Sequence, residues 1–232
     1  MQRSLFQHFW LPLYRRWALK YIQQERSFDG FGLQLVIPPG VFHPGIFFSS
    51  EIFISFLQHI DFQDKKGLDI GTGSGILAIF CAQKGACATA LDINPLAVKT
   101  TLLNASKNGV SLQVFESDLF DCLPRQCFDF VLINPPYYPR RARDLAEHAF
   151  FAGENLEYFE KLFAQLPQYI FDMQEPGNLA QKETRVWIIL SEDCDFLKMQ
   201  AISARNGFLL KPVYEKKKWG ERFFVAQADQ IR

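Results

Sequence analysis

The stretch FVLINPPYYPR, residues 130–140, ends an apolar run on an asparagine and continues with two prolines and two tyrosines. Proline has no backbone N–H, so the chain through Asn134, Pro135 and Pro136 offers carbonyl oxygens and one side-chain amide but almost no donors. Taken alone, the stretch could be only a turn after a strand. Its position after a buried-looking strand favours a rigid cluster of hydrogen-bond acceptors.

A glycine-rich stretch, LDIGTGSGI at residues 68–76, lies upstream of this cluster. Gly71, Gly73 and Gly75 allow a sharp bend and a close approach to a ligand at a helix N-terminus. The spacing is Gly-x-Gly-x-Gly, whereas a dinucleotide fingerprint requires Gly-x-Gly-x-x-Gly. This glycine loop, residues 71–75, therefore predicts a ligand site but argues against a nicotinamide dinucleotide.

Three acidic residues stand at the ends of successive predicted strands: Asp69 just before the glycine loop, Asp92 in LDINP and Asp118 in ESDLF. The carboxyl ends of parallel strands are where open α/β sheets bind ligands. A carboxylate at Asp92 can accept two hydrogen bonds from ribose hydroxyls, and Asp118 could reach an adenine amino group. Each acid alone could be a helix cap or a loop residue. Together and in this order they predict a nucleoside site.

Strands alternate with helices along most of the chain, which predicts βαβ units and a parallel sheet. Ser50 and Asn94 are expected to be N-caps of two of the helices. The chain ends on two strands around Lys218-Trp219-Gly220, which indicates an antiparallel edge. Strands are expected at 67–70, 86–93, 112–116, 128–133, 185–190, 208–216 and 222–228, and helices at 51–60, 76–85, 94–109, 156–170 and 196–207.

The motifs LDIGTGSG, LDINP, ESDLF and INPPY resemble, in this order, the motifs of class I AdoMet-dependent methyltransferases with an NPPY motif, the small-methyltransferase, HemK/PrmC-like N-methyltransferases. The resemblance implies a Rossmann-like α/β fold. Its sheet would have seven mostly parallel strands in the order 3-2-1-4-5-7-6, with the seventh strand antiparallel and helices on both faces. Residues 41–232 would form the methyltransferase domain, and residues 1–40 an extension with a helix at 5–24 and a hairpin near Asp29-Gly30.

The resemblance also implies roles for individual residues. Asp69 and the glycine loop would hold the methionine end of AdoMet, Asp92 the ribose and Asp118 the adenine. No metal is expected, because the four histidines form no cluster and the cysteine spacing fits no zinc motif. The cofactor-binding residues implied are Asp69, Gly71, Thr72, Gly73, Gly75, Asp92, Ile93, Asp118 and Leu119, and the catalytic residues implied are Asn134, Pro135, Pro136 and Tyr137.

In this family NPPY marks enzymes that methylate a planar nitrogen, whose lone pair is delocalised and attacks a methyl group poorly. Two acceptors that hold its N–H groups would orient the nitrogen and stabilise the charge that develops on it. The resemblance assigns these roles to the Asn134 side-chain oxygen and the Pro135 carbonyl, with Tyr137 stacking on the flat substrate.

Three substrate classes fit this chemistry: a protein glutamine, an adenine N6 and a guanine N2. The segments VFHPG, FAGENLEYFEKLF and KKWGERFFV resemble the glutamine methyltransferases, which favours a release-factor-type glutamine amide. RNA or DNA stays open as the alternative, since Arg140, Arg141 and Arg143 follow the NPPY motif and are expected to contact the substrate. The N-terminal helix, in which aromatic residues alternate with Arg15, Arg16 and Lys20, could also contact nucleic acid.

The composition of the chain limits which classes of protein and of partner remain. Among 232 residues, 25 Lys and Arg balance 25 Asp and Glu, so no overall basic field requires a nucleic acid partner. Neither a signal peptide nor an apolar run of about 20 residues is recognisable, and the five cysteines are an odd number. We therefore expect a cytoplasmic protein without a membrane partner. An NAD-dependent oxidoreductase and a non-catalytic AdoMet-binding protein remain as more distant alternatives.

Overall fold

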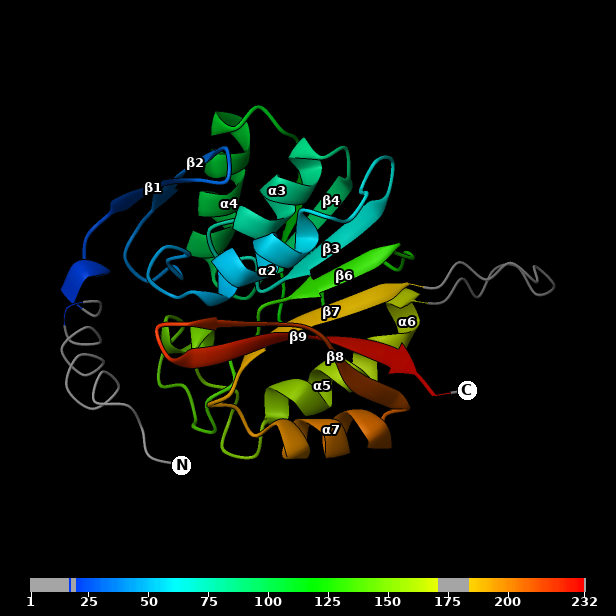
Figure 1. Ribbon diagram of the computed structural model, residues 1–232. Helices are drawn as coiled ribbons and strands as arrows, with labels where there is room; N and C mark the ends of the chain where they lie inside the picture. Colours follow the sequence, from blue (N-terminus) through cyan, green and yellow to red (C-terminus); the bar gives the residue numbers. More distant parts are fainter. Residues whose placement is uncertain (1–16, 18–19, 171–183, 232) are drawn as a thin grey trace.

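The computed structural model of the protein describes residues 17, 20–170 and 184–231 (Figure 1). Seven strands form one sheet in the order β5-β4-β3-β6-β7-β9-β8. In chain order, the strands of this sheet are β3 (Lys66–Ile70), β4 (Cys87–Asp92), β5 (Gln113–Glu116), β6 (Phe130–Ile133), β7 (Arg185–Ser191), β8 (Phe208–Lys218) and β9 (Glu221–Gln230). Counted along the chain, this is the predicted order 3-2-1-4-5-7-6, so the predicted topology is confirmed.

Strands β5, β4, β3, β6 and β7 run parallel to one another, and β9 runs antiparallel to both β7 and β8. The five parallel strands therefore bring their carboxyl ends to one edge of the sheet. Each connection between neighbouring parallel strands includes a helix or a long loop, as parallel pairing requires. The residues that follow β3, β4, β5 and β6 consequently meet at this edge, where ligands of open α/β sheets bind.

Helices cover both faces of the sheet (Figure 1). One face carries α2 (Ser49–Leu57), α3 (Ile76–Gln83) and α4 (Pro95–Lys107), whereas the other carries α5 (Glu157–Gln165), α6 (Pro167–Ile170) and α7 (Phe196–Arg205). A short 3-10 helix, η1 (Glu147–Ala149), lies in the loop between β6 and α5. Within the described residues, no helix has the length and hydropathy that a membrane span requires.

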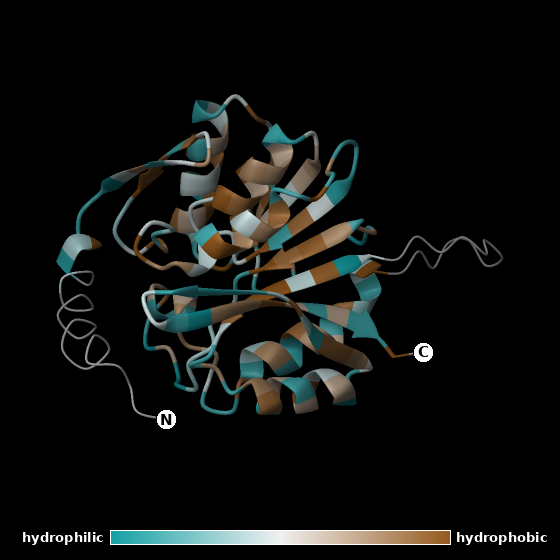
Figure 2. Cartoon of the chain, in the orientation of Figure 1, coloured by the Kyte–Doolittle hydropathy of each residue, from teal (hydrophilic) through white to brown (hydrophobic). Residues whose placement is uncertain are grey.

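The central strands are apolar on both faces, as expected for strands covered by helices on either side. In β6, Val131 and Ile133 face the core under α5 to α7, whereas Phe130 and Leu132 face the core under α2 to α4. Figure 2 shows brown along β6 and β7 and teal at the tip of the β8–β9 hairpin. The sheet therefore separates two hydrophobic cores, and both hold the strand ends in place.

A separate two-stranded hairpin, β1 (Arg26–Gly30) and β2 (Leu33–Ile37), lies beside α4. The side chain of Asn104 accepts a bond from the Val36 N–H and donates one to the Val36 carbonyl, at 2.8 and 3.0 Å. Asn108 makes the same pair of bonds with Gln34. These hydrogen bonds hold the hairpin against α4, and the hairpin shares the hydrophobic core of that helix. The division of the chain into two parts at residue 40 stays a prediction.

Some local predictions differ from the structure. Ser50 lies inside α2, which begins at Ser49, so its predicted role as an N-cap is wrong. The hairpin turns at Phe31 and Gly32, both with positive φ, and not at Asp29-Gly30. The helix predicted over 156–170 is divided before Pro167, because proline supplies no N–H to continue it. The predicted N-terminal helix falls almost entirely outside the described residues, and so does the nucleic acid contact expected of it.

Candidate active site

A pocket opens at the carboxyl-end edge of the parallel strands. The cavity and its open mouth together hold about 960 Å³. Most of its lining residues follow a strand directly: Gly71 to Ser74 after β3, Asp92 to Asn94 at the end of β4, Ser117 to Leu119 after β5, and Asn134 and Pro136 after β6. Four segments that are far apart in sequence therefore meet in one cavity.

Asp69 lies beneath the glycine loop and is only 2% exposed. Its Oδ2 accepts hydrogen bonds from the Thr72 hydroxyl at 2.7 Å and the Ala78 N–H at 3.2 Å. Its Oδ1 is buried and has no hydrogen-bond partner among the described residues. Burial raises the pKa of Asp69 to about 7, and the nearby Asp92 adds to this shift. A buried carboxylate oxygen without a donor is costly, which points to a cationic or donor ligand at this position.

Asp92 ends β4 and holds the glycine loop. Its Oδ2 accepts from the Gly73 N–H at 2.8 Å, and its Oδ1 accepts from the Asn94 N–H at 2.9 Å. Burial raises the pKa of Asp92, and these two bonds oppose that shift. Each carboxylate oxygen has a second lone pair, so both can still accept a hydroxyl hydrogen from a ligand.

The backbone of the glycine loop is bent so that only glycine suits it. Gly71 and Gly75 have φ angles of 70° and 85°, in the left-handed region. A Cβ on Gly75 would lie 3.2 Å from the Thr101 backbone, so the loop also packs closely on α4. Gly75 is the residue that precedes α3. Of the predicted loop residues, Gly71, Thr72 and Gly73 line the pocket, whereas Gly75 supports them from behind.

Asp118 is more exposed than Asp69 and Asp92. Its side chain is 53% exposed, and its Oδ2 accepts a hydrogen bond from the Lys161 ammonium of α5 at 2.7 Å. Lys161 also binds Asp121 at 2.6 Å. Asp118 and the buried Leu119 line the pocket together with Ile93, so all the predicted cofactor-binding residues lie in or directly behind one cavity.

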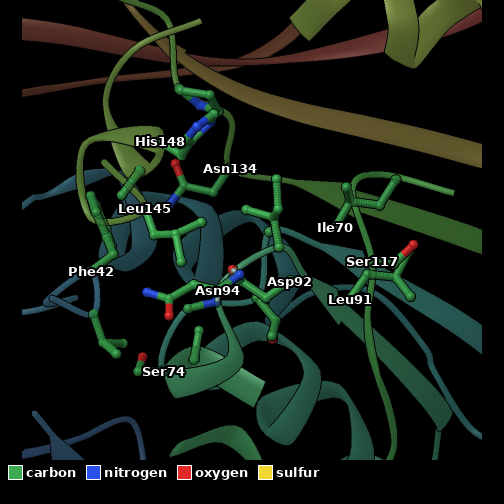
Figure 3. A pocket seen from close by; sticks show the side chains of 18 of the residues that line it. Phe42, Ile70, Ser74, Leu91, Asp92, Asn94, Ser117, Asn134, Leu145 and His148 are labelled. Atoms are coloured by element: carbon green, nitrogen blue, oxygen red, sulfur yellow. Dashed lines mark hydrogen bonds between the residues drawn. The ribbon is translucent and has the colours of Figure 1, made fainter. Parts of the chain in front are cut away.

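Asn134 follows β6 and lies at the opposite end of the pocket from Asp118. Its Nδ2 donates to the Ser50 hydroxyl of α2 at 3.3 Å. This contact orients the amide, because holding the nitrogen turns the oxygen to the other side. Figure 3 shows Asn134 next to His148 and Leu145, with Asp92 and Asn94 farther inside. Ser50 thus has a contact in the site, not the capping role expected from the sequence.

The remaining NPPY residues lie around Asn134. Pro136 lines the pocket, while Pro135 is buried behind it. The Tyr137 ring packs against the core under α5, and its hydroxyl bonds with Ser191 at the end of β7. Burial raises the pKa of Tyr137. Tyr137 therefore packs beneath the loop and does not line the cavity, and its stacking on a substrate stays a prediction.

The three arginines predicted to contact the substrate lie outside the cavity. Arg143 forms a two-pronged ion pair with Glu147 of η1, with Nε at 3.0 and 3.1 Å from its two oxygens. This pair lowers the pKa of Glu147 to about 2. The Arg140 guanidinium lies 5.0 Å from the centre of the Phe151 ring, and Arg141 is exposed.

One part of the pocket wall, formed by residues between the NPPY motif and α5, could not be predicted from sequence motifs. The chain after the NPPY motif folds back on itself through a bridge between Tyr138 and Phe151. This places Leu145, His148 and Ala149 on the cavity, and Tyr158 of α5 joins them. The Tyr158 hydroxyl is buried and has no hydrogen-bond partner in the described part of the chain. The only sequence signal was the position of these residues after the NPPY motif.

Within residues 20–170 and 184–231, no group of three or more His, Cys, Asp or Glu side chains is placed to hold a metal ion. The acceptors in the pocket suit an organic ligand with hydroxyl, amine and amide hydrogens.

Two relatives match the chain over most of its length. A protein of Methanocaldococcus jannaschii that bears the name "Putative protein N5-glutamine methyltransferase MJ0928" is 37% identical over 146 residues, 60% of this chain and 71% of the relative. The release factor glutamine methyltransferase of Geobacter sulfurreducens is 27% identical over 168 residues, 67% of this chain and 58% of the relative. The chain therefore spans less than two thirds of the second relative.

A solved structure supports the same fold. The T. Thermophilus 16S rRNA N2 G1207 methyltransferase, in complex with AdoMet and guanosine, matches with a TM-score of 0.60 and 16% identity, covering 90% of this chain and 50% of that one. The family model named methyltransferase small domain matches residues 32–157, more than half of the chain. The chain therefore belongs to the methyltransferase small domain family and is a class I AdoMet-dependent methyltransferase.

Proposed function

We propose that this protein transfers a methyl group from AdoMet to the side-chain amide nitrogen of a glutamine in a protein substrate. The observation that carries the proposal is the oriented amide of Asn134, which is held by Ser50 at one end of a pocket whose other end carries acidic acceptors. This arrangement fits a nitrogen acceptor of the methyl group at one end and an adenosine-bearing donor at the other.

The residues of the pocket fit AdoMet. The partnerless Oδ1 of Asp69 suits the cofactor's ammonium group, and the glycine loop closes around that end. Asp92 would accept from the ribose hydroxyls, with Ile93 beside it, while Asp118 and Leu119 would receive the adenine. AdoMet, when bound, supplies an electrophilic methyl group on a sulfonium. The binding roles of Asp69, Gly71, Thr72, Gly73, Gly75, Asp92, Ile93, Asp118 and Leu119 are part of this proposal.

The catalytic task of the chain is to hold the amide nitrogen. The Asn134 oxygen accepts one N–H of the substrate, and the Pro135 carbonyl accepts the other. Two fixed acceptors orient the nitrogen and stabilise the positive charge that develops on it. Pro135 and Pro136 keep competing backbone donors away, and Tyr137 supports the loop from the core. The methylated nitrogen then loses its extra proton to water.

Charge pairing favours a protein substrate over a nucleic acid. A phosphate track needs cations that face solvent without carboxylate partners. Near the pocket, Arg143 is paired with Glu147 and Lys218 with Glu51. Arg222, near the tip of the β8–β9 hairpin, lies 3.7 Å from Glu192 and 3.9 Å from Glu215. These three positive charges are thus already paired within the chain.

We also propose that Arg140, Arg141 and Arg143 contact the substrate as polar groups at the rim of the mouth.

The names of both relatives, which refer to glutamine, support the proposed substrate class. A nucleobase amino group is the second candidate, because the Asn134 site would hold its two N–H groups equally well. The odd number of cysteines fits a reducing compartment, and we place the reaction in the cytoplasm.

A transfer experiment tests this proposal. The full chain is incubated with methyl-labelled AdoMet and a lysate of a strain that lacks the protein, and the products are treated with protease or with nuclease. We expect protease-sensitive label, and a single methyl on a glutamine side chain by mass spectrometry. An Asn134→Ala variant serves as the matched control and should transfer little label. Nuclease-sensitive label would overturn the glutamine assignment, and an absence of transfer to any fraction would overturn the proposed activity.

A further inference from the structure

Tyr158 has the only hydroxyl group of the described residues that lines the pocket, is buried and has no partner. A buried hydroxyl without a hydrogen bond destabilises the folded protein, so such a group calls for an explanation. Burial raises the pKa of Tyr158, and the carboxylates of Asp92, Asp118 and Asp69 raise it further. The hydroxyl therefore stays protonated and can donate a hydrogen bond.

The fold places this hydroxyl at a defined part of the pocket. Leu156 has a φ of 67° and precedes α5, and the Tyr158 N–H bonds to the Ala152 carbonyl at 3.1 Å. Lys161 lies one turn later on the same side of α5 and reaches Asp118 at 2.7 Å. The first two turns of α5 are thus directed at the residues that follow β5.

We propose that Tyr158 is a specificity-determining residue for the cofactor, and that its hydroxyl donates a hydrogen bond to a ring nitrogen of the adenine. This inference rests on the proposed function, because it takes AdoMet as the ligand. The adenine amino group donates toward Asp118, whereas the ring nitrogens can only accept and need a donor. Asp118 cannot supply one when ionised, but Tyr158 can.

Tyr169 provides a matched control. It belongs to the same hydrophobic core, but its hydroxyl donates to the Phe120 and Leu123 carbonyls at 3.2 and 2.9 Å. Tyr158→Phe removes a hydroxyl without a partner, whereas Tyr169→Phe removes one that is satisfied and leaves two carbonyls behind. The two changes are chemically identical, and the inference predicts opposite consequences.

The test measures S-adenosylhomocysteine binding by calorimetry and ligand-free melting for the full chain and both variants. We expect Tyr158→Phe to weaken binding about threefold to tenfold, with Tm unchanged or raised. Tyr169→Phe should lower Tm and leave the Kd unchanged. The wild-type chain should also bind one of the 1-deaza, 3-deaza or 7-deaza analogues less tightly, and the Tyr158→Phe penalty should vanish for that analogue.

Two results would overturn the inference: a normal Kd for S-adenosylhomocysteine in Tyr158→Phe, or a penalty that persists with all three deaza analogues. The second result assigns the hydroxyl to another part of the ligand. Neither result touches the proposed function. In this experiment, a wild-type chain that fails to bind S-adenosylhomocysteine would instead overturn the proposed function, so the two failures are distinguishable.

Discussion

Two neighbouring parts of the pocket use different kinds of acceptor. Beneath the glycine loop, Asp69 and Asp92 are carboxylates whose burial raises their pKa values. After β6, the strand that pairs with β3, Asn134 is a neutral amide fixed by Ser50 and followed by two prolines. Both parts lie at the carboxyl ends of parallel strands of the same sheet, so the difference does not come from the architecture.

The difference teaches how charge is distributed in this site. A buried carboxylate is costly, but it binds an ammonium group or two hydroxyls strongly once they arrive. A neutral amide has a smaller desolvation cost and does not titrate. We therefore expect pH to affect cofactor binding through Asp69, and substitutions of Asn134 to affect the rate of methyl transfer.

The largest effect is expected from Asn134→Ala. Losing one preorganised polar group that acts on developing charge typically lowers kcat about 100-fold to 1000-fold. The Kd for AdoMet should change far less, because the acidic residues of the pocket remain. Steady-state kinetics on the methylated substrate and calorimetry separate the two quantities. Asn134→Asp keeps an acceptor at nearly the same point and should retain some activity. A near-normal kcat in Asn134→Ala would contradict the role given to Asn134.

Asp92→Ala should weaken AdoMet binding by about 1.5–3 kcal/mol, because two hydroxyls lose charged acceptors. Asp118→Ala should weaken it less, since that carboxylate is 53% exposed and already paired with Lys161. Calorimetry gives both dissociation constants. Equal increases in the Kd for AdoMet in the two variants would show that exposure does not distinguish these acids. An unchanged Kd for Asp92→Ala would show that Asp92 does not bind the cofactor.

Cofactor affinity should depend on pH through Asp69, whose pKa burial raises to about 7. An ammonium group binds the ionised form, so affinity should fall as pH decreases through 7 and be about tenfold weaker at pH 6 than at pH 8. The stability of the ligand-free protein has the opposite dependence. Because the pKa of Asp69 is raised on folding, the folded state binds the proton more tightly than the unfolded state, and this contribution to stability is lost as pH rises toward 7. Asp69→Asn should abolish both dependences in binding and melting measurements; an unaltered pH profile would assign them elsewhere.

Ser50→Ala should lower kcat by a few-fold, since one hydrogen bond that orients Asn134 contributes about 0.5–1.5 kcal/mol. Ser50→Thr keeps the hydroxyl and should restore the rate. Ser55→Ala is a control in the same helix, because the Ser55 hydroxyl donates to the Glu51 carbonyl away from Asn134. If Ser50→Ala and Ser55→Ala had the same kcat, the contact would have no role in positioning.

The smallest effect is expected from replacing Arg140, Arg141 and Arg143 together by alanine. For a protein substrate, KM should rise by a few-fold with no change in AdoMet affinity, since these residues lie at the rim. For a nucleic acid, the increase would be larger and would shrink at high salt, because fewer counterions are released. Kinetics at two salt concentrations distinguish the cases, and an unchanged KM would show that the arginines do not contact the substrate.

Much of the site could be predicted because it depends on strand ends. Asp92, Asp118 and Asn134 each stand where an apolar run stops, and parallel strands bring such positions to one edge. The glycine loop and the antiparallel last strand could also be predicted, because local spacing and turn residues determine them. The order of the sheet came from the family resemblance, and the structure has that order.

The sequence alone thus determined which residues end the strands, and with them the nature of the acceptors in the pocket. Only the tertiary structure decided which side chains complete them. Ser50 meets Asn134 across 84 residues, and Lys161 meets Asp118 across 43. Tyr158 enters the pocket because α5 packs against the sheet in one particular orientation. The physical reason is that periodicity fixes the face of an element, whereas contacts between distant elements depend on how their buried surfaces fit.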